Sequence, residues 1–256
     1  MTTAAAVSRR AVARMEWRKL RTVRSTWWIM LVFAAAMVGL AALAGATGPK
    51  ISGPSSYDPT ANSLLGGDVG QLVFGILGVL TLSAEFSSGS IRATFAAVPR
   101  RGRVLAAKAA VLAAITFVVG VAGTFAGFAA FAAAAPPGVP HDSLGHPGVL
   151  RALLLGAAYF SLIALVGLGL AAVIRHTAGA ISAIVAVVFL LPLVLLPLGK
   201  HIPAAKFLPE NIAVNSLIAV KPVAGAMSAG AGFAVLCLYA AAALAAGGWA
   251  LTRRDA

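Results

Sequence analysis

Long apolar segments dominate the chain, and most of its charged residues fall in the short stretches between them. A bilayer core of about 30 Å requires roughly 20 apolar residues in a helix. The apolar character is continuous rather than alternating, which excludes the strands of a membrane β-barrel. We therefore predict an all-α polytopic membrane protein with six transmembrane helices, at about 27–46, 64–84, 109–134, 152–174, 178–199 and 229–251.

Composition supports this class of protein. The 256 residues are 60% apolar and 11% charged, whereas a soluble domain carries about a quarter charged residues. The net charge of +13 would suggest nucleic-acid binding in a soluble protein. Here the basic residues flank apolar segments, so we expect anionic lipid headgroups as partners and no nucleic acid. The single cysteine, Cys237, lies within an apolar segment and is interpreted as a small apolar filler.

The distribution of Lys and Arg predicts the orientation of the chain. Fifteen of the 20 basic residues lie on one side of the predicted spans, within 9–24, 92–108, 175 and 253–254. When the acidic residues are included, this side carries +12 and the other side +1. Because loops rich in Lys and Arg remain in the cytoplasm, we predict that both termini are cytoplasmic.

Residues 8–24, before the first span, have the pattern of an amphipathic helix. At 100° per residue, Val12 and Leu20 lie opposite a row of arginines, although Glu16 and Lys19 interrupt the apolar face. Such a helix lies in the plane of the lipid headgroups; the alternative is a basic tail that only sets topology. The residues predicted to hold the helix at the membrane surface are Arg10, Arg14, Trp17, Arg18, Arg21 and Arg24.

The stretch between the second and third spans predicts a short helix. Residues 88–90, Ser-Gly-Ser, indicate a turn and a helix cap. Ile91, Phe95 and Val98 follow at i, i+4 and i+7, which places one apolar stripe on a helix that Pro99 ends. An exposed stripe of this kind suits docking into a groove on a partner protein. Alternatively, the stripe packs against its own bundle or the lipid.

The predicted spans lack the residues that catalysis inside a membrane requires. None contains a histidine, paired carboxylates or a metal-binding spacing of His and Glu. Ser161 and Ser182 have no accompanying base and are interpreted as packing serines. Asp68 is the one candidate for ion coupling, but its position also suits the positive N-terminal end of a helix. We therefore predict no enzyme, and no coupling to an ion gradient.

The chain also lacks a nucleotide site of its own. Residues 45–50 superficially resemble a phosphate loop, but they miss its spacing of Gly, four residues and Gly-Lys-Ser/Thr. We therefore predict that this chain binds no cofactor. If it moves a substrate, the energy comes from another chain, acting at the cytoplasmic helix.

Small residues in the third span indicate close helix packing. Gly123 and Gly127 are four residues apart and form a small-xxx-small pair. Such a pair lets two helices approach closely. The pattern leaves open whether the neighbouring helix belongs to the same chain or to another copy.

Three stretches resemble one known family. They are 16–28 (EWRKLRTVRSTWW), 85–94 (EFSSGSIRAT) and 98–108 (VPRRGRVLAAK). In these stretches, and in its plan of six spans, the chain resembles the ABC-2 type permease subunits of bacterial ATP-binding-cassette exporters. The resemblance implies a single transmembrane permease domain without a nucleotide-binding domain. It also implies a surface helix at the N-terminus and a coupling helix between the second and third spans.

The resemblance further implies a place in a transporter of the bacterial cell membrane. A separate ABC ATPase subunit would use ATP, and a second permease copy or paralogue would complete the export pathway. No predicted span presents a charged pocket, so the expected cargo is a small-molecule drug, lipid or natural product. The alternative is a non-transporting scaffold or sensor that works with an ATPase. The implied ATPase-coupling residues are Glu85, Phe86, Gly89, Ile91, Arg92 and Phe95.

Overall fold

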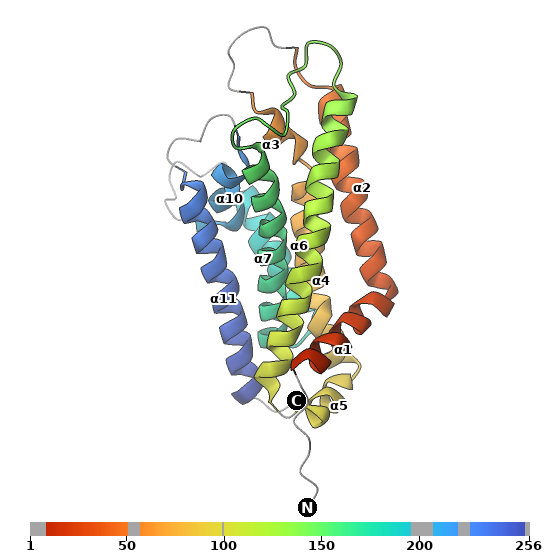
Figure 1. The fold of residues 1–256 in the computed structure, drawn as a ribbon. Helices are drawn as coiled ribbons and strands as arrows, with labels where there is room; N and C mark the ends of the chain where they lie inside the picture. The colour runs from red at the N-terminus through yellow and green to blue at the C-terminus, as the bar shows by residue number, and fades with distance from the viewer. Residues whose placement is uncertain (1–8, 51–56, 99, 196–206, 220–225, 254–256) are drawn as a thin grey trace, which may run out of the picture.

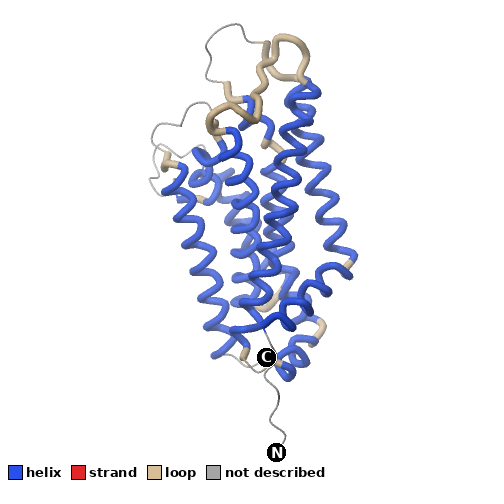
Figure 2. The backbone as a smooth tube through the Cα atoms, viewed as in Figure 1, coloured by secondary structure: helices blue, strands red, loops and turns tan. Residues whose placement is uncertain are grey.

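The computed structural model describes residues 9–50, 57–98, 100–195, 207–219 and 226–253. Within these residues the chain is helical and contains no β-strand (Figure 2). The elements are α1 (Arg9–Thr22), α2 (Arg24–Ala46), α3 (Pro59–Ser63), α4 (Gly67–Ser87), α5 (Ser90–Ala97), α6 (Arg101–Ala134), α7 (Val149–Ile174), α8 (Thr177–Val185), the π-helical turn η1 (Ala186–Leu190), α9 (Leu191–Leu195), α10 (Pro209–Leu217) and α11 (Ala229–Arg253).

Six of the described segments are long and apolar enough to cross a membrane. They are α2, α4, α6, α7, α11 and the continuous run from Thr177 to Leu195, which confirms the predicted all-α polytopic fold. The fifth span changes to π-helix at η1, directly before Pro192. Proline lacks the N–H that a regular helix needs, which explains the local change of hydrogen bonding. Residues 196–199 of the predicted fifth span lie outside the described residues.

The helices form an elongated bundle with two distinct ends (Figure 1). One end holds α1, α5 and the last turn of α11, and is called the α5 end. The opposite end holds α3 and α10, and is called the α3 end. Between them α7 occupies the middle, where it packs along α4, α6 and α11. It is also the most buried of the six spans.

Three phenylalanines from different helices form the centre of the apolar core. The rings of Phe33 (α2), Phe74 (α4) and Phe160 (α7) have centroids 4.5–5.8 Å apart, in tilted and edge-on arrangements that aromatic pairs favour. Two glycines of α6 make room for α2. A Cβ on Gly123 would lie 2.3 Å from the Phe33 ring, and one on Gly127 would lie 3.1 Å from the α2 backbone. The small-xxx-small pair therefore packs against a helix of the same chain.

The helix α6 extends two turns beyond the predicted third span. It begins at Arg101 rather than near residue 109. The prediction kept Lys108 outside the span because an unpaired ammonium is costly at membrane depth. In the structure Lys108 lies within α6 and is 1% exposed. Its burial requires compensating charges, which come from distant parts of the sequence.

Hydrogen bonds between segments hold the α3 end together. The Asp58 carboxylate accepts a hydrogen bond from the Ala61 N–H at 2.8 Å, which caps α3, and one from the Ala219 N–H at 2.7 Å, just after α10. Thr60 donates to Asp142 at 2.6 Å. Of the 200–228 segment, the described residues include α10, whereas 200–206 and 220–225 lie outside them.

Candidate functional site

Four charged side chains meet at the α5 end and form an alternating cluster. The Lys108 Nζ lies 2.6 Å from Glu16 Oε2 and 2.7 Å from Glu85 Oε1. The Lys19 Nζ lies 2.8 Å from the same Glu85 oxygen and 3.8 Å from Glu16 Oε1. Each ammonium therefore contacts both carboxylates. We call these four residues the charged cluster.

Three helices supply the charged cluster. Glu16 and Lys19 stand one turn apart on α1, Glu85 lies in the last turn of α4, and Lys108 lies in the second turn of α6. The α5 helix joins through Thr94, whose hydroxyl accepts a hydrogen bond from Lys19 at 3.4 Å. The cluster thus connects the surface helix and the short helix to two membrane spans.

Burial makes the charged cluster a strong constraint on the fold. Glu16 and Lys108 are each 1% exposed, Glu85 is also buried, and the Lys19 side chain is partly exposed. Removing ions from water costs several kcal/mol for each ion, so a buried charge is tolerated only beside its partners. The two Lys and two Glu sum to zero formal charge. Removing one buried member alone would therefore leave an uncompensated charge and destabilise the α5 end.

A cavity of about 340 Å³ adjoins the charged cluster. All four charged residues line it, together with Thr and Ser side chains from α1, α2, α4 and α5. Within the described part of the chain, Glu16 Oε1 and Glu85 Oε2 accept no hydrogen bond. A cavity of this size, with charged and hydroxyl side chains on part of its wall, has room for water that can satisfy both oxygens.

The apolar stripe on α5 faces the protein, so the predicted exposed docking stripe is wrong. Ile91 is 2% exposed and belongs to the main core. Val98 is buried against Val12 of α1 and Val104 of α6, and Phe95 packs on both groups. The alternative interpretation, a stripe that packs on its own bundle, is correct. The surface of α1 supplies the apolar partners that the stripe alone did not reveal.

The remaining predicted coupling residues, Phe86, Gly89 and Arg92, lie on or beside α5 and have different environments. Gly89 has a left-handed backbone (φ +69°) and makes the sharp turn from α4 into α5. Phe86 lies under the guanidinium of Arg175 at 5.5 Å, a cation–π contact. Arg92 is exposed. The outward face of α5 consists of Arg92, Ala93, Ala96 and Ala97, all of them exposed.

The predicted surface residues of α1 also face outward. On α1, Arg14, Trp17, Arg18 and Arg21 are exposed, as is Arg24 at the start of α2, whereas the Arg10 side chain lies outside the described atoms. The exposed Trp27 and Trp28 follow at the start of α2. Exposed tryptophans beside arginines are typical of a membrane–water interface. The interruption of the apolar face by Glu16 and Lys19 is the signal that could have revealed the charged cluster.

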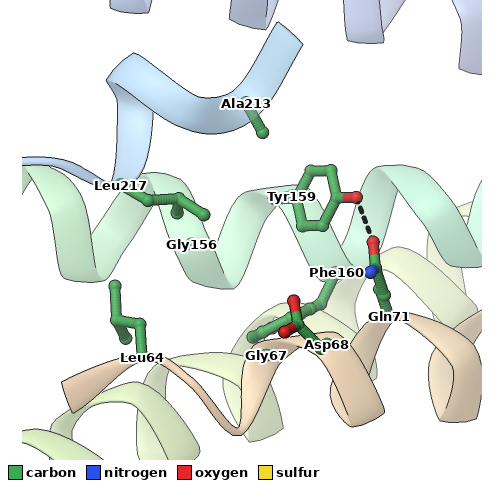
Figure 3. Close-up of a pocket in the computed structure, with 9 residues that line it drawn as sticks. All are labelled: Leu64, Gly67, Asp68, Gln71, Gly156, Tyr159, Phe160, Ala213 and Leu217. Atoms are coloured by element: carbon green, nitrogen blue, oxygen red, sulfur yellow. Dashed lines mark hydrogen bonds between the residues drawn. The ribbon is translucent and has the colours of Figure 1, made fainter. Parts of the chain in front are cut away.

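A second, smaller polar site lies near the α3 end (Figure 3). A cavity of about 40 Å³ lies between α4, α7 and α10, and Asp68, Gln71 and Tyr159 line it. The Tyr159 hydroxyl donates a hydrogen bond to Gln71 Oε1. Asp68 occupies the first turn of α4, as the predicted interaction with the helix N-terminus requires. Deeper in the bundle, Ser161 donates hydrogen bonds to carbonyl oxygens and accepts one from Thr116 at 3.1 Å, in keeping with a packing serine.

Comparison with known proteins identifies one family. Residues 12–193 match the family described as ABC-2 family transporter protein. The matched region covers more than two thirds of the chain and includes the whole charged cluster, α5 and the first five spans except the last two residues of α9. No curated protein matches the chain.

We predict that Lys108→Met strongly destabilises the protein. The substitution leaves two buried carboxylates without their shared ammonium, and breaking a buried ion pair in this way costs about 3–5 kcal/mol. Thermal unfolding of the purified protein in a neutral detergent measures the effect. The matched control is Arg100→Met, which removes an exposed charge beside the start of the same helix.

Removing all the buried charges together provides the second half of this test. Glu16→Gln/Glu85→Gln/Lys108→Met leaves no buried charge without a partner and is expected to recover most of the lost stability. Equal stability of Lys108→Met and the wild type would show that the charged cluster does not constrain the fold.

Proposed function

Since the chain belongs to the ABC-2 family of transporter proteins, we propose that it is the membrane-spanning permease subunit of an ABC exporter driven by a separate ATPase subunit. The observation that carries the proposal is the connection of α5 to two membrane spans through the charged cluster. A permease without its own ATPase site needs such an element to receive motion from its partner.

The two faces of α5 have different roles in coupling: the outer face binds the ATPase and the inner face contacts the spans. Arg92, Ala93 and Ala96 form an exposed face of small side chains and one cation, on which an ATPase surface can dock. On the opposite face Ile91 and Phe95 pack into the bundle. A push on the outer face would therefore reach the spans directly, through close-packed side chains that transmit displacement.

Charged contacts carry the same displacement to other helices. Thr94 and Lys19 join α5 to α1 and to Glu85 of α4, and Lys108 extends the contact to α6. On the side facing α11, Arg101 lies over the Phe95 ring and donates a hydrogen bond to the Leu251 carbonyl at 2.8 Å. A movement of α5 would thus involve α1, α4, α6 and the end of α11.

The lipid-facing surfaces support a membrane assembly with further partners. The exposed arginines of α1 suit anionic headgroups of the cytoplasmic leaflet. Large exposed apolar side chains continue along α11, among them Leu238 and Trp249. Lipid, or a second permease copy or paralogue, would cover these faces and complete a pathway of which this chain forms half.

We predict that substitutions on the outward face of α5 weaken binding of the ATPase subunit. Ala93→Trp adds a bulky obstacle and Arg92→Glu reverses the exposed charge, and neither alters the buried face. Loss of one central interface contact lowers affinity by about tenfold or more. Copurification with the ABC ATPase and ATP hydrolysis by the complex measure the effect.

The control is Lys50→Glu, the same charge reversal at an exposed position of the α3 end. It is expected to leave association unchanged. If both α5 variants bind the ATPase as well as the wild type does, α5 is not the docking element. If association is normal but no variant or wild-type complex transports any cargo, the scaffold or sensor interpretation is favoured.

We predict that the α5 end is cytoplasmic, because its flanking segments contain most of the Lys and Arg. In a Cys237→Ala background, a membrane-impermeant maleimide should label Ser143→Cys on intact cells. It should label Ala93→Cys only after permeabilisation, since both positions are exposed at opposite ends. The reverse pattern of labelling would contradict the proposed topology.

A further inference from the structure

The cavity near the α3 end contains a carboxylate whose partner the described chain does not supply. Among the described residues, none donates a hydrogen bond to Asp68 or forms an ion pair with it. Its carboxylate is directed into the space between α4 and α7 (Figure 3). Among the described residues, no Lys, Arg or His lines the cavity. The Asp68 side chain is exposed at its edge, so the site presents an accessible negative charge for which the lining residues supply no cation.

The residues around Asp68 in this cavity are a buried polar pair and an aromatic ring. Gln71 is 2% exposed and uses its amide oxygen to accept the Tyr159 hydroxyl hydrogen bond. Tyr159 itself is buried, so the pair is held within the bundle rather than displayed at the surface. The Phe160 ring lies beside Asp68 in Figure 3. A carboxylate next to aromatic rings attracts a cation both by charge and by cation–π contact.

The volume of the cavity and its apolar lining restrict the class of ligand further. The volume of about 40 Å³ accommodates a group comparable to a few water molecules, such as an ammonium group. Leu64 and Leu217 line the same cavity and offer an apolar surface beside the charge. An alkyl chain attached to the ammonium would lie along these leucines. Together these features select an amphipathic amine over a neutral or anionic lipid.

We propose that this cavity binds the ammonium group of an amphipathic amine, with Asp68 as the counter-ion, and that such amines are a substrate class of the transporter. The binding site stands on the cavity alone, and only its assignment to a transported substrate rests on the proposed function. The proposal also narrows the expected cargo, a small-molecule drug, lipid or natural product, to amphipathic amines. Asp68 then serves two roles, at the helix N-terminus and toward the ligand.

Hexylammonium is a suitable probe because it is water-soluble and joins one ammonium to a short apolar chain. Calorimetric titration of the purified full chain in a neutral detergent should show saturable binding of hexylammonium, and weak or no binding of hexanol or hexanesulfonate. Asp68→Asn keeps the size of the side chain and should lower the affinity for hexylammonium by about tenfold or more, since it removes a charged hydrogen-bond acceptor. Lys50→Gln, which removes an exposed charge elsewhere at the α3 end, should not alter affinity.

A second variant tests the cavity without removing the charge. Gly156 lines the cavity, and a Cβ there would meet its nearest neighbour at an ordinary 3.4 Å. Gly156→Ala should therefore fold normally and weaken hexylammonium binding by occupying part of the space. Unchanged affinity in both Asp68→Asn and Gly156→Ala would overturn the proposal. So would Asp68-dependent binding of sodium ions with no response to hexylammonium.

Failure of the amine-binding proposal can be distinguished from failure of the proposed permease function. Binding of hexylammonium requires no ATPase subunit, whereas export requires one. Asp68-dependent binding without any ATPase association would support the site and contradict the permease function. ATPase coupling through α5 with no binding of hexylammonium would support the permease function and overturn the amine site.

Discussion

The burial of the Lys108 ammonium is the constraint on which the α5 end of the protein depends. A lone ammonium at this depth would be expelled toward water, and α6 would then begin later, as its sequence suggests. Glu16 and Glu85 lie within 2.7 Å of it and make burial possible. Because these carboxylates belong to α1 and α4, neutralising one lysine fixes the positions of three helices. The helix α5 then fits between them through its apolar stripe.

In this arrangement the short helix α5 is exposed on one face and packed against the bundle on the other. Its buried face contacts the core and α1, while its outer face carries small side chains and Arg92. An element that is both exposed to a partner and anchored to membrane spans suits the transfer of motion. The packed side chains of Ile91 and Phe95 and the hydrogen bond from Lys19 to Thr94 limit how α5 can move independently. On the proposed function, a displacement of α5 would therefore be shared with the spans rather than absorbed locally.

The spans could be predicted from the sequence because each is identified by its own length and apolar composition. The existence of α1 and α5 could also be predicted, since the helical spacing of apolar residues is local. The charged cluster was indicated only in part: Glu16 and Lys19 interrupt the apolar face of α1, but no local pattern pairs position 16 with positions 85 and 108. The prediction that the α5 stripe is exposed was wrong for the same reason: the stripe packs against other helices, among them α1 at Val12, which is distant in the sequence. Local patterns thus gave the elements, whereas their contacts required the three-dimensional structure.

The central claim is that the charged cluster transmits motion from α5 to the spans. Pulsed electron resonance between spin labels at Leu65→Cys and Ala129→Cys, in a Cys237→Ala chain bound to its ATPase, measures that motion at the α3 end. We predict that ATP binding changes this distance in the wild type. In Glu16→Gln/Glu85→Gln/Lys108→Met the ATPase should still bind, but the change in distance should be smaller, because only the apolar contacts of α5 remain to transmit it. An ATP-dependent change of equal size in both proteins would contradict the account.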